Sequence, residues 1–122
     1  MRKILIIEDN HLVRSTLDKI LRGSGFEVVT AKDGVQGVAA FSREHPDLVI
    51  TDIIMPEKEG LQTIREIRQE QSDAKIIAIS GGGRVGNVDY LSKAQELGAI
   101  ETIAKPFDPE ELVERVKRCL AA

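Results

Sequence analysis

Five short hydrophobic runs are spaced along the chain, and longer amphipathic segments separate them. The runs are KILII at 3–7, FEVVT at 26–30, LVIT at 48–51, KIIAI at 75–79 and TIA at 102–104. Each run is too short for a helix, and most of them lack strict alternation with polar residues, which is typical of strands covered on both faces. The pattern predicts five buried strands.

The segments between and after the runs repeat hydrophobic residues at helical spacing. The repeating positions are Leu12, Val13, Thr16, Leu17, Ile20 and Leu21, then Leu61, Ile64 and Ile67, then Leu91, Ala94 and Leu97, and last Leu112, Val113, Val116 and Leu120. A further helical segment opens near Asp33 and closes at His45-Pro46. Asp108-Pro109 marks the start of the last helix, with Asp at the N-cap. Gly23 and Gly98 stand where helix ends favour a left-handed residue.

Strands that alternate with helices imply a parallel sheet with helices on both of its faces. The sequence therefore predicts an α/β fold, a doubly wound five-stranded (βα)₅ sheet. No linker or internal repeat interrupts the 122 residues, so we expect one domain over 1–122.

Composition narrows the range of functions. A net charge of −3 provides no basic surface for nucleic acid, and 3% aromatic residues disfavour base stacking. The single Cys119 rules out an internal disulfide and fits a reducing cytoplasm. No hydrophobic run approaches the length of about 18 residues that a membrane span needs, and the run at 4–7 is too short for a signal peptide. We expect a cytoplasmic protein that binds neither nucleic acid nor membrane.

Polar residues follow four of the predicted strands. Glu8-Asp9 follows the first run, Asp52 the third, Ser80 the fourth and Lys105 the fifth. In an open parallel sheet, ligands bind outside the carboxyl ends of the strands. A single acid at a strand end more often caps a helix or faces solvent. The agreement of four strand ends favours a functional site.

Close carboxylates repel one another unless a cation lies among them. Oxygen ligands without His or Cys point to a hard ion, Mg²⁺ or Mn²⁺. Lys105 and Ser80 are suited to hold phosphoryl oxygens, and Asp52 is a candidate nucleophile that forms an aspartyl-phosphate.

The ordered set resembles the receiver domain of two-component response regulators, the CheY-like family, over the whole chain. The matching residues are Glu8-Asp9, Asp52 in DIIMP followed by Gly60, Ser80, and Lys105-Pro106-Phe107. The resemblance implies a flavodoxin-like sheet with the strand order 2-1-3-4-5, which receivers share with flavodoxin. This order is an expectation taken from the family, since the hydrophobic pattern alone leaves it open.

The resemblance also implies a role for each acid. Asp52 would accept phosphate from a phosphohistidine on a sensor histidine kinase or a histidine phosphotransfer protein. Asp9 and Asp52 would ligate Mg²⁺ directly, with the backbone carbonyl of Ile54 as a further ligand. Glu8 would act through metal-bound water.

Lys105 would pair with a phosphoryl oxygen, and its peptide bond to Pro106 would be cis. Ser80 would hydrogen-bond the phosphoryl group and move toward it on activation. Such a domain phosphorylates itself, with at most slow autodephosphorylation. It acts on a downstream protein or an output domain, and a phosphorylation-dependent dimer is a further expectation.

Two features depart from the family pattern. Thr102 stands where receivers carry Tyr or Phe, so the usual coupling of a hydroxyl to an aromatic ring cannot operate. The glycine-rich stretch at 81–86 is either a poorly ordered loop or a source of backbone amides and a mobile switch that replaces the ring.

Three other functions stay open. A haloacid-dehalogenase-like phosphohydrolase would carry a second Asp where this chain has Ile54. A flavodoxin-like FMN carrier would want a hydroxyl-rich loop where Glu8-Asp9 repels phosphate, and more aromatics than this chain has. The third alternative is an interaction module that is never phosphorylated, and Thr102 in place of the usual aromatic residue is the feature that favours it.

Overall fold

Strands and helices alternate along the chain, as the hydrophobic pattern predicts. A computed structural model of the protein describes residues 2–53, 60–80, 84–85, 88–89 and 94–121. The elements are β1 (Lys3–Ile7), α1 (His11–Gly23), β2 (Glu27–Ala31), α2 (Gly34–Glu44), β3 (Leu48–Asp52), α3 (Gly60–Glu70), β4 (Ile76–Ser80), β5 (Arg84–Val85), β6 (Val88–Asp89), β7 (Glu101–Ala104) and α5 (Pro109–Ala121). Residues 94–96 are also helical. None of the helices in these ranges is long and apolar enough to cross a bilayer.

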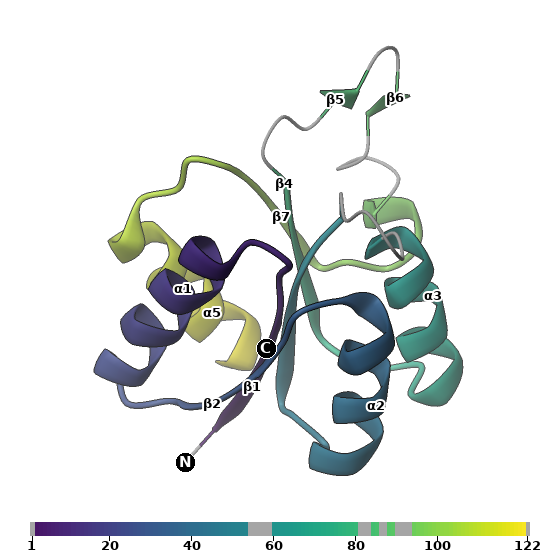
Figure 1. The fold of residues 1–122 in the computed structure, drawn as a ribbon, viewed down its shortest axis with the longest axis horizontal. Coiled ribbons are helices and arrows are strands. Elements are labelled where there is room, and N and C mark those ends of the chain that lie inside the picture. The colour runs from purple at the N-terminus through teal and green to yellow at the C-terminus, as the bar shows by residue number, and fades with distance from the viewer. Residues whose placement is uncertain (1, 54–59, 81–83, 86–87, 90–93, 122) are drawn as a thin grey trace.

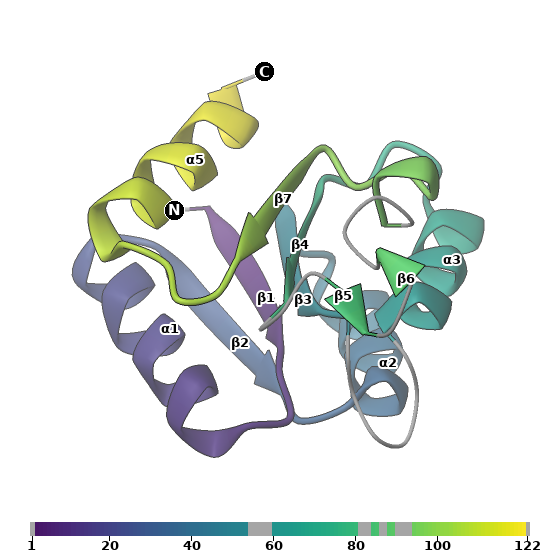
Figure 2. The same ribbon diagram turned by 90° about the horizontal axis from the view of Figure 1, so that it is seen from above.

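The main sheet has five parallel strands in the order β2-β1-β3-β4-β7. This is the predicted order 2-1-3-4-5, with β7 as the fifth long strand. Helices α1 and α5 cover one face of the sheet, and α2 and α3 cover the other (Figures 1 and 2). The doubly wound fold is confirmed.

Hydrophobic side chains fill the space on both faces of the sheet. All five residues of β3 are buried, which explains why this run lacks polar alternation. The core under α2 and α3 includes Leu5, Ile7, Phe41, Ile64 and Ile67. The core under α1 and α5 includes Ile4, Ile6, Leu17, Ile50 and Leu112. Each helix thus packs its hydrophobic stripe against alternate residues of the same strands.

Several element ends differ from the prediction by a residue or two. Asp52 and Ser80 are the last residues of β3 and β4 and do not follow them, because a polar residue can continue the ladder of a strand. Gly23 is helical, and the positive φ falls at Gly25 (94°), where the N–H bonds back to Arg22. The prediction for Gly23 is therefore wrong. Gly98 does have a positive φ, 109°.

The cap positions of two helices follow the prediction. Asp33 caps α2, and its side chain accepts a hydrogen bond from the N–H of Gln36 at 2.8 Å. His45 ends the same helix in the left-handed region, at φ 49°. Pro109 is the first residue of α5, directly after Asp108.

A two-stranded antiparallel sheet after β4 was not predicted. Strands β5 and β6 pair Arg84 with Asp89 and Val85 with Val88, and they stand apart from the main sheet (Figure 1). The available signal was the dipeptide Gly86-Asn87 between two valines, a composition that favours a hairpin. Leu91 of the predicted fourth helix lies outside the described residues, and Leu97 follows the helical residues 94–96 in a turn.

Gly60 begins α3 directly against the end of β3. Its N–H donates to the carbonyl of Ile53 at 3.1 Å. A Cβ atom at Gly60 would overlap the carbonyl oxygen of Asp52 and the Cα of Ile53. Because these are backbone atoms, they cannot move aside as a flexible side chain would.

We expect Gly60→Ala to lower the free energy of unfolding by about 2–3 kcal/mol, the cost of overpacking a tight contact. Urea denaturation followed by circular dichroism measures it. Gly23→Ala is the matched control, since a Cβ there meets nothing within 4 Å and Gly23 is helical. The free energy of unfolding of this control should rise by roughly 0.5–1 kcal/mol, because Ala has a higher helix propensity than Gly. Equal stability of the two variants would contradict the expectation.

Candidate acidic and lysine site

Three acids meet at the carboxyl edge of the main sheet. Glu8 and Asp9 follow β1, and Asp52 ends the neighbouring strand β3. Each of them offers one carboxylate oxygen, and these oxygens lie within 4.8 Å of one another. Glu8 and Asp52 are buried, whereas Asp9 is exposed. The parallel topology therefore brings together acids that lie far apart in the sequence.

Lys105 bridges two of the three acids. It follows β7, and its Nζ donates to Glu8 Oε1 at 2.8 Å and to Asp52 Oδ2 at 3.2 Å. The side chain of Glu8 is 0% exposed, that of Asp52 is 7% exposed and that of Lys105 is 19% exposed. Charges this deep are tolerated only when they are paired, and the pairing ties β1, β3 and β7 together.

The pKa values of Glu8 and Lys105 are both shifted in this cluster. Burial raises the pKa of Glu8 to about 7, and the charge of Asp52 adds to the rise, although the hydrogen bond from Lys105 opposes it. Burial lowers the pKa of Lys105, but its hydrogen bond to Glu8 and the charge of Asp52 outweigh burial and raise it overall. The lysine therefore stays charged, and burial favours the protonated form of Glu8.

The turn between β1 and α1 is held by its own hydrogen bonds. Asn10 caps α1, because its Oδ1 accepts from the N–H of Val13 at 3.0 Å. The N–H of Asn10 donates to Glu8 Oε2 at 3.1 Å. Arg14 Nη1 donates to the carbonyl oxygens of Glu8, at 2.9 Å, and Asp9, at 3.4 Å. Sequence reasoning missed Asn10 and Arg14; Asn before a hydrophobic helical repeat was a usable cap signal, and Arg14 had none.

The remaining predicted residues are placed as follows. Lys105-Pro106 is a cis peptide bond, as expected. Ser80 is paired with Ala104 in the ladder between β4 and β7, at the same edge as the acids. Thr102 lies within β7, where its carbonyl accepts from Arg115 Nη1 at 2.9 Å. Ile54 and the glycines of 81–86 lie outside the described residues.

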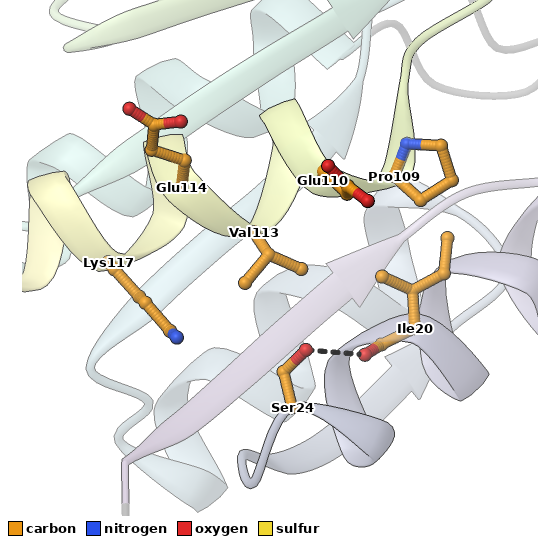
Figure 3. Close-up of a pocket in the computed structure, with 7 residues that line it drawn as sticks. All are labelled: Ile20, Ser24, Pro109, Glu110, Val113, Glu114 and Lys117. Atoms are coloured by element: carbon orange, nitrogen blue, oxygen red, sulfur yellow. Dashed lines mark hydrogen bonds between the residues drawn. The ribbon is translucent and has the colours of Figure 1, made fainter.

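A hollow lies between α1 and α5, away from the acids. It has a volume of about 470 Å³ and is lined by the seven residues of Figure 3: Ile20, Ser24, Pro109, Glu110, Val113, Glu114 and Lys117. Ser24 Oγ donates to the carbonyl of Ile20 there, at 3.1 Å. None of the predicted site residues lines this hollow.

The raised pKa of Glu8 makes the metal-free protein less stable as the pH rises. Folding raises the pKa of Glu8 from 4.5 to about 7. The contribution of this group to the free energy of unfolding is therefore complete below pH 4.5 and is lost as the pH rises through 7. Glu8→Gln cannot ionise. We expect its free energy of unfolding, relative to wild type, to increase by on the order of 2 kcal/mol between pH 5 and pH 8 in EDTA.

Urea denaturation at a series of pH values measures this difference. Glu44→Gln is the control, because the hydrogen bond from Lys3 lowers the pKa of Glu44, whose effect on stability is then confined to acid pH. Its difference from wild type stays constant from pH 5 to pH 8. A constant difference for Glu8→Gln as well would refute the assignment.

Comparison with known proteins identifies relatives over the whole chain. The family model described as response regulator receiver domain matches residues 4–117. The probable transcriptional regulator ycf27 of Cyanophora paradoxa is 39% identical over 119 residues, 98% of this chain and 48% of that protein. Sporulation initiation phosphotransferase F of Bacillus subtilis is 30% identical over 118 residues, 97% of this chain and 93% of that protein.

The structural match is equally extensive. Response regulator protein TrrA from Thermotoga maritima, in complex with Mg²⁺–BeF, superposes with a TM-score of 0.86 and 35% identity over 98% of this chain and 99% of that chain. The chain spans about half the length of the ycf27 relatives that it matches. With these matches and this site, the chain belongs to the response regulator receiver domain family, whose members accept phosphate in two-component signalling.

Proposed function

We propose that Asp52 is the phosphoacceptor and that residues 1–122 work as a single receiver domain. The observation that supports this most directly is the position of the Asp52 carboxylate, which lies among Glu8, Asp9 and Lys105. One of its oxygens already accepts a hydrogen bond from an ammonium group. An ammonium there is also placed to neutralise a phosphoryl oxygen attached to Asp52.

The proposed step transfers a phosphoryl group from a phosphohistidine. A carboxylate oxygen of Asp52 attacks the phosphorus atom while the bond between phosphorus and the imidazole nitrogen breaks. The electron pair of that bond stays on the imidazole, which leaves as the neutral ring after taking up any proton it needs from solvent. Lys105 holds one phosphoryl oxygen, and the hydroxyl of Ser80 hydrogen-bonds another.

The acid cluster suits a magnesium ion, with manganese as a substitute. One carboxylate oxygen from each of the three acids lies within 4.8 Å of the other two, and two of the acids pair with Lys105. The cluster therefore keeps a negative charge that a divalent cation would balance. Asp9, Asp52 and the backbone carbonyl of Ile54 would hold the ion directly, and Glu8 would hold it through water. The bound ion supplies charge neutralisation for the phosphoryl group.

The protein's partners follow from this role. The donor would be a sensor histidine kinase or a histidine phosphotransfer protein in the cytoplasm. The phosphorylated domain would act on a downstream protein or an output domain, with dimerisation on phosphorylation as one route. The name of the ycf27 relatives, transcriptional regulators, supports an output of that kind. The domain would act once per phosphorylation, with slow autodephosphorylation rather than turnover of other substrates.

The switch would differ from that of receivers with an aromatic residue. Thr102 offers no ring, so movement of Ser80 would be transmitted through the backbone ladder between β4 and β7 or through the glycines of 81–86. In that ladder Ser80 pairs with Ala104 and Thr102 pairs with Ala78. A shift at Ser80 would thus reach the outermost strand through the backbone pairs that join β4 to it.

Incubation with acetyl phosphate and Mg²⁺ should add one phosphoryl group to the wild-type protein, read as a mass increase of the intact chain. Asp52→Asn should show no adduct, since the amide is a poor nucleophile. EDTA should abolish the adduct in wild type, and Mn²⁺ should restore it. Each result depends on the site and not on the donor protein.

Asp47→Asn is the matched control, because Asp47 precedes the opposite end of β3 and accepts a hydrogen bond from the backbone N–H of Lys3. It should be phosphorylated as wild type is. Absence of an adduct on wild type, or an undiminished adduct on Asp52→Asn, would rule out the proposal. Repeated release of phosphate from small phosphoesters would point to a phosphohydrolase instead.

A further inference from the structure

The three acids of the site are not held in the same way. The Glu8 carboxylate accepts hydrogen bonds from Lys105 Nζ and from the N–H of Asn10. The Asp52 carboxylate also accepts a hydrogen bond from Lys105 Nζ. The Asp9 carboxylate is exposed, and within the described ranges no side chain or backbone group donates to it. Its direction therefore depends on the peptide units of the turn that carries it.

Arg14 is the side chain that donates hydrogen bonds to those peptide units. It lies in the first half of α1 and is half-buried. Nη1 donates to the carbonyl oxygen of Glu8 at 2.9 Å and reaches that of Asp9 at 3.4 Å, the long end of the hydrogen-bonding range. Nη2 lies 3.2 Å from Nδ1 of His11. The planar guanidinium thus ties two consecutive carbonyls to the helix that follows them.

The orientation of the Asp9 carboxylate depends on such backbone contacts. Repulsion from Asp52 and Glu8 favours an Asp9 carboxylate that turns away into solvent, because no group in the described ranges holds it in. A metal ion that must gather Asp9 from many orientations loses affinity to the entropy of ordering it. A guanidinium that fixes the Glu8 and Asp9 carbonyls removes much of that loss before the ion arrives.

We propose that Arg14 is a positioning residue for the metal step: it holds the Glu8–Asp9 turn so that the Asp9 carboxylate points at the site. This inference rests on the proposed function, since it concerns the binding of Mg²⁺ by Asp9. Arg14 acts through the backbone and does not touch the ion. Residues that orient metal ligands typically contribute about tenfold or more to affinity.

A purely electrostatic role for Arg14 makes a different prediction. If only its positive charge mattered, losing it would strengthen the binding of a cation, and Lys would replace it fully. If the two-carbonyl contact matters, losing it weakens cation binding despite the removed charge. Lys, with a single ammonium point, would not reproduce the planar fork.

Calorimetric titration of Mg²⁺ into the full chain tests this. Arg14→Gln and Arg14→Lys should each bind Mg²⁺ roughly tenfold more weakly than wild type. The rise in melting temperature on adding Mg²⁺ should shrink in parallel. Arg22→Gln is the matched control: Arg22 also lies on α1 and donates to a carbonyl, that of Val28 at 2.8 Å, but at the far end of the helix. It should bind Mg²⁺ as wild type does.

The outcomes separate the two levels of inference. Wild-type affinity in Arg14→Gln or in Arg14→Lys, or an equal loss in Arg22→Gln, overturns the role of Arg14 and leaves the proposed function standing. A wild-type protein that binds no Mg²⁺ overturns both. If Arg14→Gln fails to fold, Arg14→Lys decides alone, because it keeps the charge and most of the side chain's length.

Discussion

The bridge from Lys105 to Glu8 and Asp52 is the constraint on which the arrangement of the sheet edge depends. Its three members come from the ends of β7, β1 and β3, and β4 lies between β3 and β7 in the sheet. The lysine therefore spans the end of β4 to reach its partners. Removing Lys105 would take the ammonium away from two buried carboxylates at once, and the loss of one partner costs several kcal/mol in comparable buried pairs. The strand ends are held in register by charge as well as by the backbone ladder.

If the cluster binds a divalent ion as proposed, Glu8 would couple that binding to the release of a proton. With a pKa of about 7, Glu8 is protonated in part of the molecules at neutral pH when no ion is bound. Lys105 remains charged under the same conditions. A divalent ion favours the ionised form of a nearby carboxylate, so its binding and the loss of that proton are coupled. Glu8 would thus be partly neutral without the ion and ionised with it. Burial, which makes the ionised acid costly, also makes the ion's contribution large.

The sequence predicted the sheet because its strands are covered on both faces. Runs such as 3–7 and 48–51 have no polar alternation, and the buried residues of β1 and β3 account for it. The strand-end positions of Glu8, Asp52 and Lys105 followed from the topology alone. What the pattern could not provide was the pairing between them, because Lys105 and Glu8 are 97 positions apart and only side-chain geometry decides that Lys105 meets Glu8 at 2.8 Å.

Local geometry explains the other misses. Gly25 rather than Gly23 takes the left-handed position, since α1 continues to Gly23 and Ser24 caps it. The β5–β6 pair depends on two residues per strand, which is too short for a hydrophobic pattern to register. Arg14 falls on the partly exposed side of an amphipathic helix, where composition predicts only a solvated charge. To predict its contact with the carbonyls of Glu8 and Asp9, one would have to know the conformation of the turn that precedes α1.

The edge strand β7 would constrain the switch that we propose, because α5 holds it through side-chain contacts. On β7, the carbonyl of Thr102 is bonded to Arg115 of α5, and Glu101 pairs with Arg115 at 3.3 Å and with Arg118 at 3.1 Å. An aromatic ring at position 102 would report a change at Ser80 by turning, with little movement of the strand. Thr102 has no ring to turn, so a signal that passed through β7 as proposed would displace backbone that Arg115 contacts. On that route, the contacts of Arg115 and Arg118 with Glu101 and with the Thr102 carbonyl would link a displacement of β7 to α5.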